Sequence, residues 1–377
     1  MPAFTLHVGP NIRRSPYYEA TVADGVASFS VYNHMLIPGS FGDPQAEYAR
    51  LIDGVVMWDV AAQRQVEIAG PDAERLIRRL TPRDLTGLTA GRGRYVPICD
   101  DEGLLINDPV LLKLAEDRFW LSVADSDVEL WARGQALALG LDVRVFEAEA
   151  APLAIQGPKA FDVAADLLGA WVRDLKRFEF RPADVAGIAL LVMRAGWSKQ
   201  GGVELYLIDP AQGGALWDAV RTAGAPYGII PGAPNDWERI EGGLLSYGAD
   251  ARRPEQAADP FELGLGALVD LEREDDFVGK AALIARKKAG LSRRRVGLLI
   301  DGPAHDDAGP HPLIDAAGAP AGTLWEHCAS PRFGRTIGVG LVATAALARP
   351  GGLRVVFPDG PRAATPCAPD FSDAAHS

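Results

Sequence analysis

Apolar and polar residues follow one another along this chain in a pattern that predicts strand–helix units. Residues 118–125 (RFWLSVAD) and 203–208 (VELYLI) predict strands, because aromatic and branched apolar residues fill them. A helical pattern follows each strand, SDVELWARGQALAL in the first case and DPAQGGALWDAVRTAG in the second. Ser126 is placed to cap the first helix, with a glutamate three residues on, and Asp209 is placed to cap the second.

The same order of elements occurs twice. Ile68-Ala-Gly-Pro-Asp-Ala opens one helical run, and Ile155-Gln-Gly-Pro-Lys-Ala opens another. Leu130-Trp131 and Leu216-Trp217 then fall at matching places in the two downstream helices. Chance similarity between two common strand–helix units is the alternative, but two separate markers at nearly the same offset favour two related α+β subdomains.

The pattern changes toward the C-terminus. A basic helical stretch, KAALIARKKAGLSRRR, is followed by VGLLI, TIGVGLVA and LRVVF, which alternate with turns that contain glycine and proline. Short strands with frequent turns predict a separate β-rich domain. The segment from Pro358 to Ser377 is rich in proline, alanine and aspartate, and we expect it to be loose.

Composition narrows the classes of function. The chain has 377 residues and a net charge of −12, and its basic residues form no stripe, which disfavours a nucleic-acid partner. It lacks the apolar start of a signal peptide and any apolar run of the length that spans a bilayer. Three separated cysteines fit a reducing compartment, so we expect a cytoplasmic protein with no membrane partner.

Two acidic residues are candidates for chemistry. Asp108, followed by proline, stands between two apolar runs and could reach a ligand, although a lone Asp-Pro is more often a turn former. Glu204 follows a Gly-rich loop at 196–202, shares a strand face with Tyr206 and has Trp197 nearby. A carboxylate beside two aromatic rings suits a flat heterocycle with paired N–H donors, such as a pterin. A surface hairpin with a solvated carboxylate is an equally good interpretation.

The remaining candidates are weaker. Arg239 lies at a helix start that Asn235 caps, and it could bind a carboxylate bidentately, whereas an ion pair on the helix surface is the default. His305, His311 and His327 are grouped only loosely and show no metalloprotease spacing. We therefore predict no catalytic metal.

These segments, in this order, resemble the folate-binding family of the glycine cleavage T protein, the aminomethyltransferases, over nearly the whole chain. The resemblance implies an α+β fold of three domains arranged like a clover leaf. It assigns residues 1–285 to a folate-binding region of two interleaved α+β subdomains, and residues 286–377 to a C-terminal β-barrel with a loose tail. Tetrahydrofolate is the implied cofactor. Asp108 matches the functional aspartate of the family, and the residues implied to bind the cofactor are Tyr95, Asp108, Val110, Trp197, Glu204 and Arg239.

Within the family, VYNHML, NDPVLLKL and GWSKQGG are most similar to the dimethylsulfoniopropionate demethylases. The residues Ser198-Lys199-Gln200 stand where the glycine cleavage enzymes have Thr-Gly-Glu. The resemblance implies transfer of a sulfonium methyl group to N5 of tetrahydrofolate. Aromatic faces attract such cations, so Tyr32, Trp171 and Tyr206 are the candidates to surround the substrate.

Three alternatives stay open on the sequence. The first is an aminomethyltransferase that works on a lipoyl carrier protein, and the second is another folate-dependent N- or O-demethylase. The third is a non-enzymatic folate-binding protein of iron–sulfur maintenance, which ranks lowest because its Lys-Gly-Cys motif is replaced by Val278-Gly279-Lys280-Ala281. The expected ligands are a small-molecule substrate and folate, and a homodimer is left open.

Overall fold

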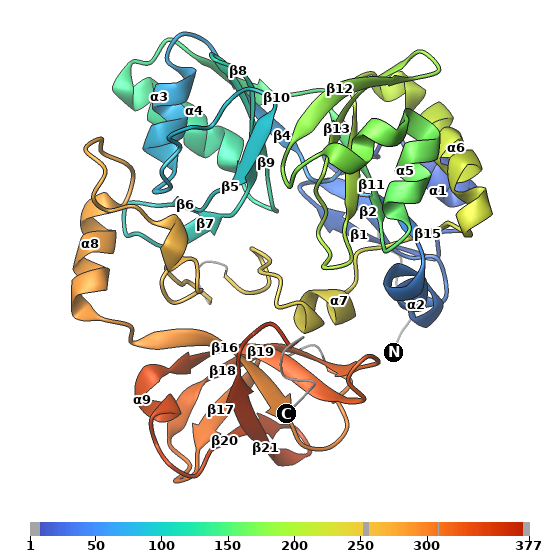
Figure 1. Cartoon of the computed structure of the whole chain (residues 1–377). Coiled ribbons are helices and arrows are strands. Elements are labelled where there is room, and N and C mark those ends of the chain that lie inside the picture. The colour runs from blue at the N-terminus through green and yellow to red at the C-terminus, as the bar shows by residue number, and fades with distance from the viewer. Residues whose placement is uncertain (1–7, 252–255, 308, 372–377) are drawn as a thin grey trace. The chain divides into compact units, whose positions relative to one another are not determined.

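The computed structural model describes residues 8–251, 256–307 and 309–371, which form two compact units. Each unit is assembled from stretches that are far apart in the sequence (Figure 1). Unit 1 comprises Met1–Gln65, Glu147–Gly196 and Gln200–Pro234, and unit 2 comprises Val66–Phe146, Trp197–Lys199 and Asn235–Ser377. Among the described residues, no helix combines the length and the apolar character needed to cross a membrane.

Unit 1 is built on a six-stranded sheet with the strand order β12-β13-β14-β11-β3-β15. Its strands are β3 (Val56–Asp59), β11 (Ala151–Gln156), β12 (Phe180–Val185), β13 (Ile188–Met193), β14 (Gly202–Leu207) and β15 (Ile230–Gly232). Its α-helices are α1 (Tyr18–Ala23), α2 (Pro44–Asp53), α5 (Ala160–Leu168) and α6 (Gly213–Gly224), with short 3-10 helices η1 (Ala170–Asp174), η2 (Pro210–Gln212) and η3 (Ala225–Tyr227). A separate hairpin pairs β1 (Ser28–Tyr32) with β2 (Met35–Ser40).

The core of unit 1 lies between this sheet and helices α5 and α6. Alternate residues of β14, Val203, Leu205 and Leu207, join this core together with apolar residues of both helices. Successive side chains of a strand point to opposite faces of the sheet. Glu204 and Tyr206 therefore lie on the face of β14 that is turned away from this core, as the sequence predicts for the pair.

Unit 2 contains a five-stranded sheet with the order β10-β4-β9-β8-β5. Its strands are β4 (Gln65–Ala69), β5 (Arg92–Tyr95), β8 (Val110–Ala115), β9 (Arg118–Ser122) and β10 (Arg144–Glu147), and β6 (Ile98–Cys99) pairs with β7 (Leu105–Asn107) beside it. Helices α3 (Ala73–Leu80) and α4 (Val128–Leu139) pack their apolar residues onto β4, β8 and β9 to form the core. Strand β9 and helices α3 and α4 have the type that the hydrophobic pattern predicts.

The two sheets share an order of strands, which supports the internal duplication. The run β10-β4-β9-β8-β5 of unit 2 corresponds to β3-β11-β14-β13-β12 of unit 1, with β4 and β11 leading into the first helix of each repeat. The glycines of the two echoed motifs have a similar backbone, with φ of +137° at Gly70 and +120° at Gly157. A residue with a side chain is strained at such φ values, so the backbone conformation explains why glycine occurs in both motifs.

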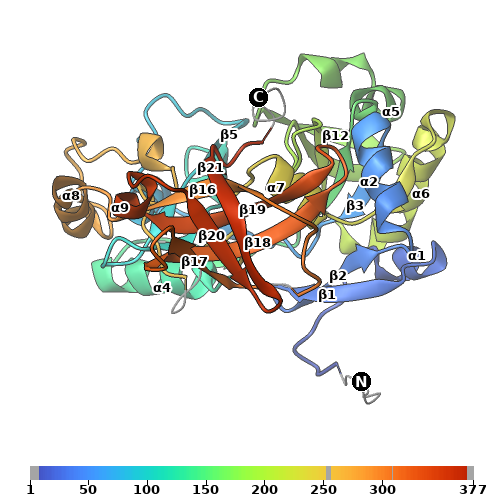
Figure 2. The same cartoon turned by 90° about the horizontal axis from the view of Figure 1, so that it is seen from below.

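The C-terminal part of unit 2 is a closed β-barrel with the order β16-β19-β18-β17-β20-β21 (Figure 2). Its strands are β16 (Arg293–Ile300), β17 (His311–Asp315), β18 (Pro320–Ser330), β19 (Arg335–Ala343), β20 (Leu353–Phe357) and β21 (Gly360–Cys367). A connector precedes the barrel and carries α7 (Asp236–Glu241), η4 (Gly266–Leu268) and α8 (Lys280–Ala289), and α9 (Thr344–Leu347) follows β19. The predicted fold class, two related α+β subdomains and a C-terminal β-barrel, is confirmed. The predicted boundary between residues 285 and 286 stays a prediction.

The expectation of a loose tail from Pro358 is wrong for residues 360–367. These residues form β21, which pairs with β16 from Gly297↔Cys367 to Ile300↔Ala364 and also pairs with β20. Phe371, beyond the strand, is buried. Small residues and prolines conceal the strand in the sequence, and its backbone hydrogen bonds complete the barrel. Residues 372–377 lie outside the described part of the chain.

The predicted helix starts have mixed outcomes. Asn235 accepts a hydrogen bond from the backbone N–H of Glu238 at 3.0 Å, so this cap is confirmed. Asp209 accepts one from Ala211 and caps the 3-10 helix η2, which leads into α6, whereas the N-cap residue of α6 itself is Gln212. At α4 the N-cap residue is Asp127, one position after the predicted Ser126. The hydroxyl of Ser126 donates to the carbonyl of Ile106, because the strand end that carries Asn107 lies beside it.

Candidate functional site

Asp108 lies in a short break between β7 and β8, as the sequence predicts. The preceding residue, Asn107, fixes this turn because its side-chain amide donates to the carbonyl of Ala124 at 3.0 Å and to the hydroxyl of Ser126 at 2.7 Å. The amide oxygen of Asn107 accepts the backbone N–H groups of Asp108 and Ala124. Asn107 is fully buried, and both its amide nitrogen and its amide oxygen form hydrogen bonds. It therefore fixes the backbone that carries the half-buried Asp108.

Tyr95 and Val110 lie directly beside this carboxylate. They are paired residues in the β5–β8 ladder, so their side chains share one face. The Tyr95 hydroxyl donates to Oδ2 of Asp108 at 2.6 Å. The structure thus brings together three of the predicted folate residues, Tyr95, Asp108 and Val110.

The environment of Asp108 changes its acidity. Burial, the largest effect, raises the pKa of Asp108 to about 7, and the negative charge of Asp250 acts in the same direction. The hydrogen bond from Tyr95 opposes this rise, because it stabilises the ionised carboxylate. Burial and the charge of Asp108 also raise the pKa of Tyr95 well above its ordinary value, so the phenol keeps its proton. A carboxyl group that titrates near neutral pH can take up or release a proton during a reaction.

Arg239 occupies a buried network of charges. Its guanidinium donates to Oδ1 of Asp250 at 3.1 Å and forms a second ion pair with Glu326 of β18. Asp250 is fully buried and accepts Arg295 at 3.1 Å through its other oxygen. The same oxygen also accepts the backbone N–H of Ser246. Arg239, only 2% exposed, is thus committed to protein carboxylates.

This network lies within electrostatic reach of the Tyr95–Asp108 pair. Asp250 raises the pKa of Asp108, and Arg295 lowers the pKa of Tyr95. The sequence reasoning missed Asp250, Arg295 and Glu326. Asp250 closely follows the RIEGGLLSYG string, so this string could have indicated it. Arg295 and Glu326 lie on barrel strands that are far away in the sequence.

The Gly-rich loop divides between the two units. Trp197 belongs to unit 2, where its indole N–H faces the carbonyl of Leu245 at 3.4 Å. The backbone N–H of Lys199 donates to Glu238 of α7 at 2.6 Å. In unit 1, Gly196 packs against the side chain of Gln156 so closely that a Cβ atom would lie 2.0 Å from its oxygen. The φ of Gly196 is +153°, which residues with a side chain rarely adopt, so the backbone at this point of the loop favours glycine.

Glu204 and Tyr206 form a pair on β14 in unit 1. The Tyr206 hydroxyl donates to Oε2 of Glu204 at 2.6 Å. Both residues are buried, and burial raises the pKa of Glu204. The sequence prediction that these side chains share one strand face is confirmed. A buried carboxylate with one tyrosine donor retains acceptor capacity, since two carboxylate oxygens offer about four lone pairs.

Tyr32 and Trp171 have a different setting from Tyr206. Both pack against the apolar core that Val203 and the helices of unit 1 form, and the Trp171 indole donates to the carbonyl of Leu168 at 2.8 Å. Tyr206 lies on the opposite face of β14. The structure of unit 1 does not gather the three rings on one face, and their assignment to the substrate stays a prediction.

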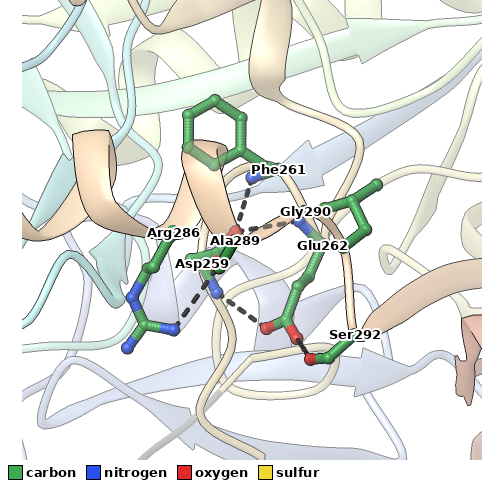
Figure 3. A pocket seen from close by; sticks show the side chains of 8 residues that line it. Asp259, Phe261, Glu262, Arg286, Ala289, Gly290 and Ser292 are labelled. Atoms are coloured by element: carbon green, nitrogen blue, oxygen red, sulfur yellow. Dashed lines mark hydrogen bonds and ion pairs between the residues drawn. The ribbon is translucent and has the colours of Figure 1, made fainter.

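A pocket of about 270 Å³ lies at α8 in unit 2 (Figure 3). Its acidic groups are already paired, because Glu262 binds the guanidinium of Arg293 at 2.8 Å and Asp259 accepts backbone N–H groups. No predicted site residue lines the pocket, and we assign it no role in the chemistry. It is lined by Asp259, Phe261, Glu262, Arg286, Ala289, Gly290, Leu291 and Ser292.

Comparison with known proteins adds independent findings. The family model described as the GCVT N-terminal domain matches residues 17–273. The chain is 42% identical over 356 residues to a protein of Ruegeria pomeroyi named dimethylsulfoniopropionate demethylase DmdA, covering 94% of this chain and 96% of that protein. It is 34% identical to a probable aminomethyltransferase of Halobacterium salinarum, covering 89% of this chain and 92% of that protein.

A solved structure shares the fold. The crystal structure of the glycine cleavage system aminomethyltransferase T from Bartonella henselae aligns with a TM-score of 0.85. The alignment covers 96% of this chain and 98% of that chain at 23% sequence identity. The likeness therefore extends through the C-terminal β-barrel as well as the part that the family model matches.

Proposed function

Because this chain belongs to the family of the GCVT N-terminal domain, we propose that it is a tetrahydrofolate-dependent demethylase. The reaction transfers the sulfonium methyl group of dimethylsulfoniopropionate to N5 of tetrahydrofolate, giving 5-methyltetrahydrofolate and methylmercaptopropionate. The observation that carries the proposal is the 42% identity to a dimethylsulfoniopropionate demethylase over nearly the full length of both chains. An enzyme of this kind fits a cytoplasmic location.

The residues of the candidate site fit a reduced folate. Glu204 offers a buried carboxylate for the N–H donors of a pterin, with Tyr206 already fixing one of its oxygens. In unit 2, Trp197 and Tyr95 offer aromatic rings and Val110 offers an apolar contact. The family resemblance assigns these three residues to the same cofactor as Glu204. Tetrahydrofolate, when bound, supplies N5 as the methyl acceptor.

Asp108 is proposed to manage the proton of the reaction. The methyl group leaves a sulfonium, whose sulfur takes the bonding electrons and becomes a neutral thioether. A secondary amine that gains this methyl group has to lose a proton, and the carboxylate of Asp108 accepts it. A pKa of about 7 suits this task, since the ionised form is available at neutral pH and the protonated form is not strongly acidic. A sulfonium is a good leaving group, so alignment of the reactants supplies most of the remaining acceleration.

Arg239 is proposed to position the site through its ion pair with Asp250. Its guanidinium is held by Asp250 and Glu326, which leaves few donors for a ligand. Of the three aromatic candidates, Tyr206 is proposed for the sulfonium, because it lies on the same face of β14 as Glu204. Tyr32 and Trp171 pack against the core on the other side, so we propose no contact of theirs with the sulfonium.

A direct assay tests the proposed reaction. The purified chain is incubated with tetrahydrofolate and dimethylsulfoniopropionate without oxygen, and both products are measured by liquid chromatography. We expect equal amounts of 5-methyltetrahydrofolate and methylmercaptopropionate. Turnover of glycine betaine, dimethylglycine or a methoxy-aromatic compound instead would refute the substrate and leave the folate assignment standing. Asp108→Ala and Glu204→Ala should both weaken folate use, and full activity in both variants would refute the site.

An aminomethyltransferase is the second candidate function, favoured by the 34% identity to the Halobacterium salinarum protein. Such an enzyme requires a lipoyl carrier protein that bears an aminomethyl group. Activity that appears only when this carrier is added would favour the second function. Light scattering on the same preparation distinguishes a monomer from the homodimer, which stays a prediction.

A further inference from the structure

Four polar side chains meet at one end of the barrel in unit 2. His311 is the first residue of β17, His327 lies on β18, and His305 and Asp307 lie on the loop between β16 and β17. Oδ1 of Asp307 lies 3.0 Å from Nε2 of His311 and 2.7 Å from Nδ1 of His305. The ring of Phe357 packs against the imidazoles, with its centroid 4.6 Å from that of His311. None of these side chains belongs to the proposed reaction.

The hydrogen bonds of His327 determine which of its nitrogens is free. Nε2 lies 3.1 Å from the backbone carbonyl of His305. A carbonyl oxygen only accepts hydrogen bonds, so Nε2 carries the proton. In the neutral ring the lone pair then resides on Nδ1. This Nδ1 atom is buried and has no hydrogen-bond partner among the described residues.

A histidine with one nitrogen bonded to a carbonyl and the other left free is typical of a metal ligand. The carbonyl fixes the tautomer and the direction of the ring, and the free nitrogen binds the metal. His311 is also well placed, since it is 5% exposed and its Nε2 lies 3.0 Å from Oδ1 of Asp307. This nitrogen is buried and has no hydrogen-bond partner of good geometry among the described residues. One ligand atom from each of Asp307, His311 and His327 lies within 4.8 Å of the other two.

We infer that Asp307, His311 and His327 form a binding site for one divalent ion of the zinc class. Two imidazoles and one carboxylate are a ligand set that zinc, cobalt and nickel accept, whereas magnesium and calcium prefer oxygen ligands alone. Ligand atoms about 2.0–2.1 Å from a tetrahedral zinc ion lie roughly 3.3–3.5 Å apart. The exposed loop that carries Asp307 supplies the freedom for this small adjustment of the distances.

The role of the site is structural. Binding joins β17, β18 and the loop between β16 and β17. The residue before His327 is Glu326, which pairs with Arg239 in the charge network of unit 2. A bound ion would thus hold the strand that carries Glu326, without contact to the reacting groups.

Metal binding to the whole chain tests the inference. The protein, freed of any affinity tag and treated with EDTA, is titrated with ZnCl₂ by calorimetry and with CoCl₂ by absorption spectroscopy. We expect one equivalent of Zn²⁺ with a dissociation constant at or below the micromolar range, and a rise in Tm on binding. The Co²⁺ spectrum should show d–d bands without the thiolate charge-transfer bands that the cysteines would produce.

Variants locate the site. His327→Gln and Asp307→Asn should each lower the affinity for Zn²⁺ at least tenfold, and the exposed Asp307 serves as the variant that leaves the buried rings intact. His34→Asn is the matched control and should bind as the parent does, because His34 is exposed and its φ of +58° is one that asparagine adopts. Less than one equivalent bound by the parent, unchanged affinity in both cluster variants, or thiolate bands in the Co²⁺ spectrum would overturn the inference.

Discussion

Replacing Tyr95 with phenylalanine isolates one interaction of the proposed proton acceptor. The change removes the hydroxyl that donates to Asp108 at 2.6 Å and keeps the ring and its β5–β8 pairing. This hydrogen bond lowers the pKa of Asp108 against the larger effect of burial. Its loss should therefore raise the pKa of Asp108 above the value of about 7.

The size of the change follows from the charge of the acceptor. A hydrogen bond to an ionised group contributes about 1.5–3 kcal/mol, and one pKa unit corresponds to about 1.4 kcal/mol. The pKa of Asp108 should thus rise by about 1–2 units in Tyr95→Phe. If the carboxylate form is the active one, activity appears as pH rises through this pKa. The acidic limb of the kcat profile should move to higher pH by the same amount.

The assay is demethylation at saturating folate and substrate between pH 5.5 and 9.5. Tyr227→Phe is the matched control, because it removes a tyrosine hydroxyl that donates to an exposed carboxylate, that of Asp166, at 2.7 Å. This control should leave the acidic limb where it is in the parent. An unchanged limb in Tyr95→Phe, or a limb that moves to lower pH, would refute the assignment of Asp108 as the titrating group.

Three further predictions concern other buried carboxylates. Glu204→Gln should raise the KM for tetrahydrofolate about tenfold or more with a smaller effect on kcat, because it weakens charge-assisted hydrogen bonds to the pterin; an unchanged KM would contradict the pterin role. Asp250→Asn should move the acidic limb to lower pH, opposite to Tyr95→Phe, because the charge of Asp250 raises the pKa of Asp108. The same variant should lose about 3–5 kcal/mol of unfolding free energy in urea, because Arg239 and Arg295 both lose a charged partner. Burial raises the pKa of Asp59 to about 6 from an ordinary 3.8, so its contribution to stability is complete below pH 3.8 and is lost as the pH rises to about 6. Asp59→Asn should therefore gain up to about 3 kcal/mol in unfolding free energy at pH 7.5 and little near pH 4, as measured by urea denaturation, and equal effects at both pH values would refute this account.

Local features of the fold were predictable because their causes lie close together in the sequence. The echoed Gly-Pro motifs, the Asn235 cap and the alternation in β14 each depend on residues within one or two turns of one another. The duplication was predictable for the same reason. The paired markers Leu130-Trp131 and Leu216-Trp217 both lie on helices, α4 and α6, although Leu130 is exposed and Leu216 is buried.

The features that the sequence did not predict depend on distant partners. Ser126 has the spacing of a cap, yet the neighbouring strand end recruits its hydroxyl. Strand β21 lacks a strong apolar alternation and exists because two barrel strands pair with it. The charge network joins Arg239 to residues of β16 and β18, and no local pattern reveals such a connection.

The sheet of unit 1 also sets an order for synthesis. Strand β3 obtains one neighbour when residues 153–156 are made and the other only with residues 230–232. At the usual rate of about 5–20 residues per second, its apolar side chains wait roughly 9–35 s for the second neighbour on the ribosome. The stretch 66–146, which can begin to form its own core, emerges in the meantime. A strand that is translated early thus obtains its last neighbour late, and a chaperone that shields it should raise the yield of folded protein.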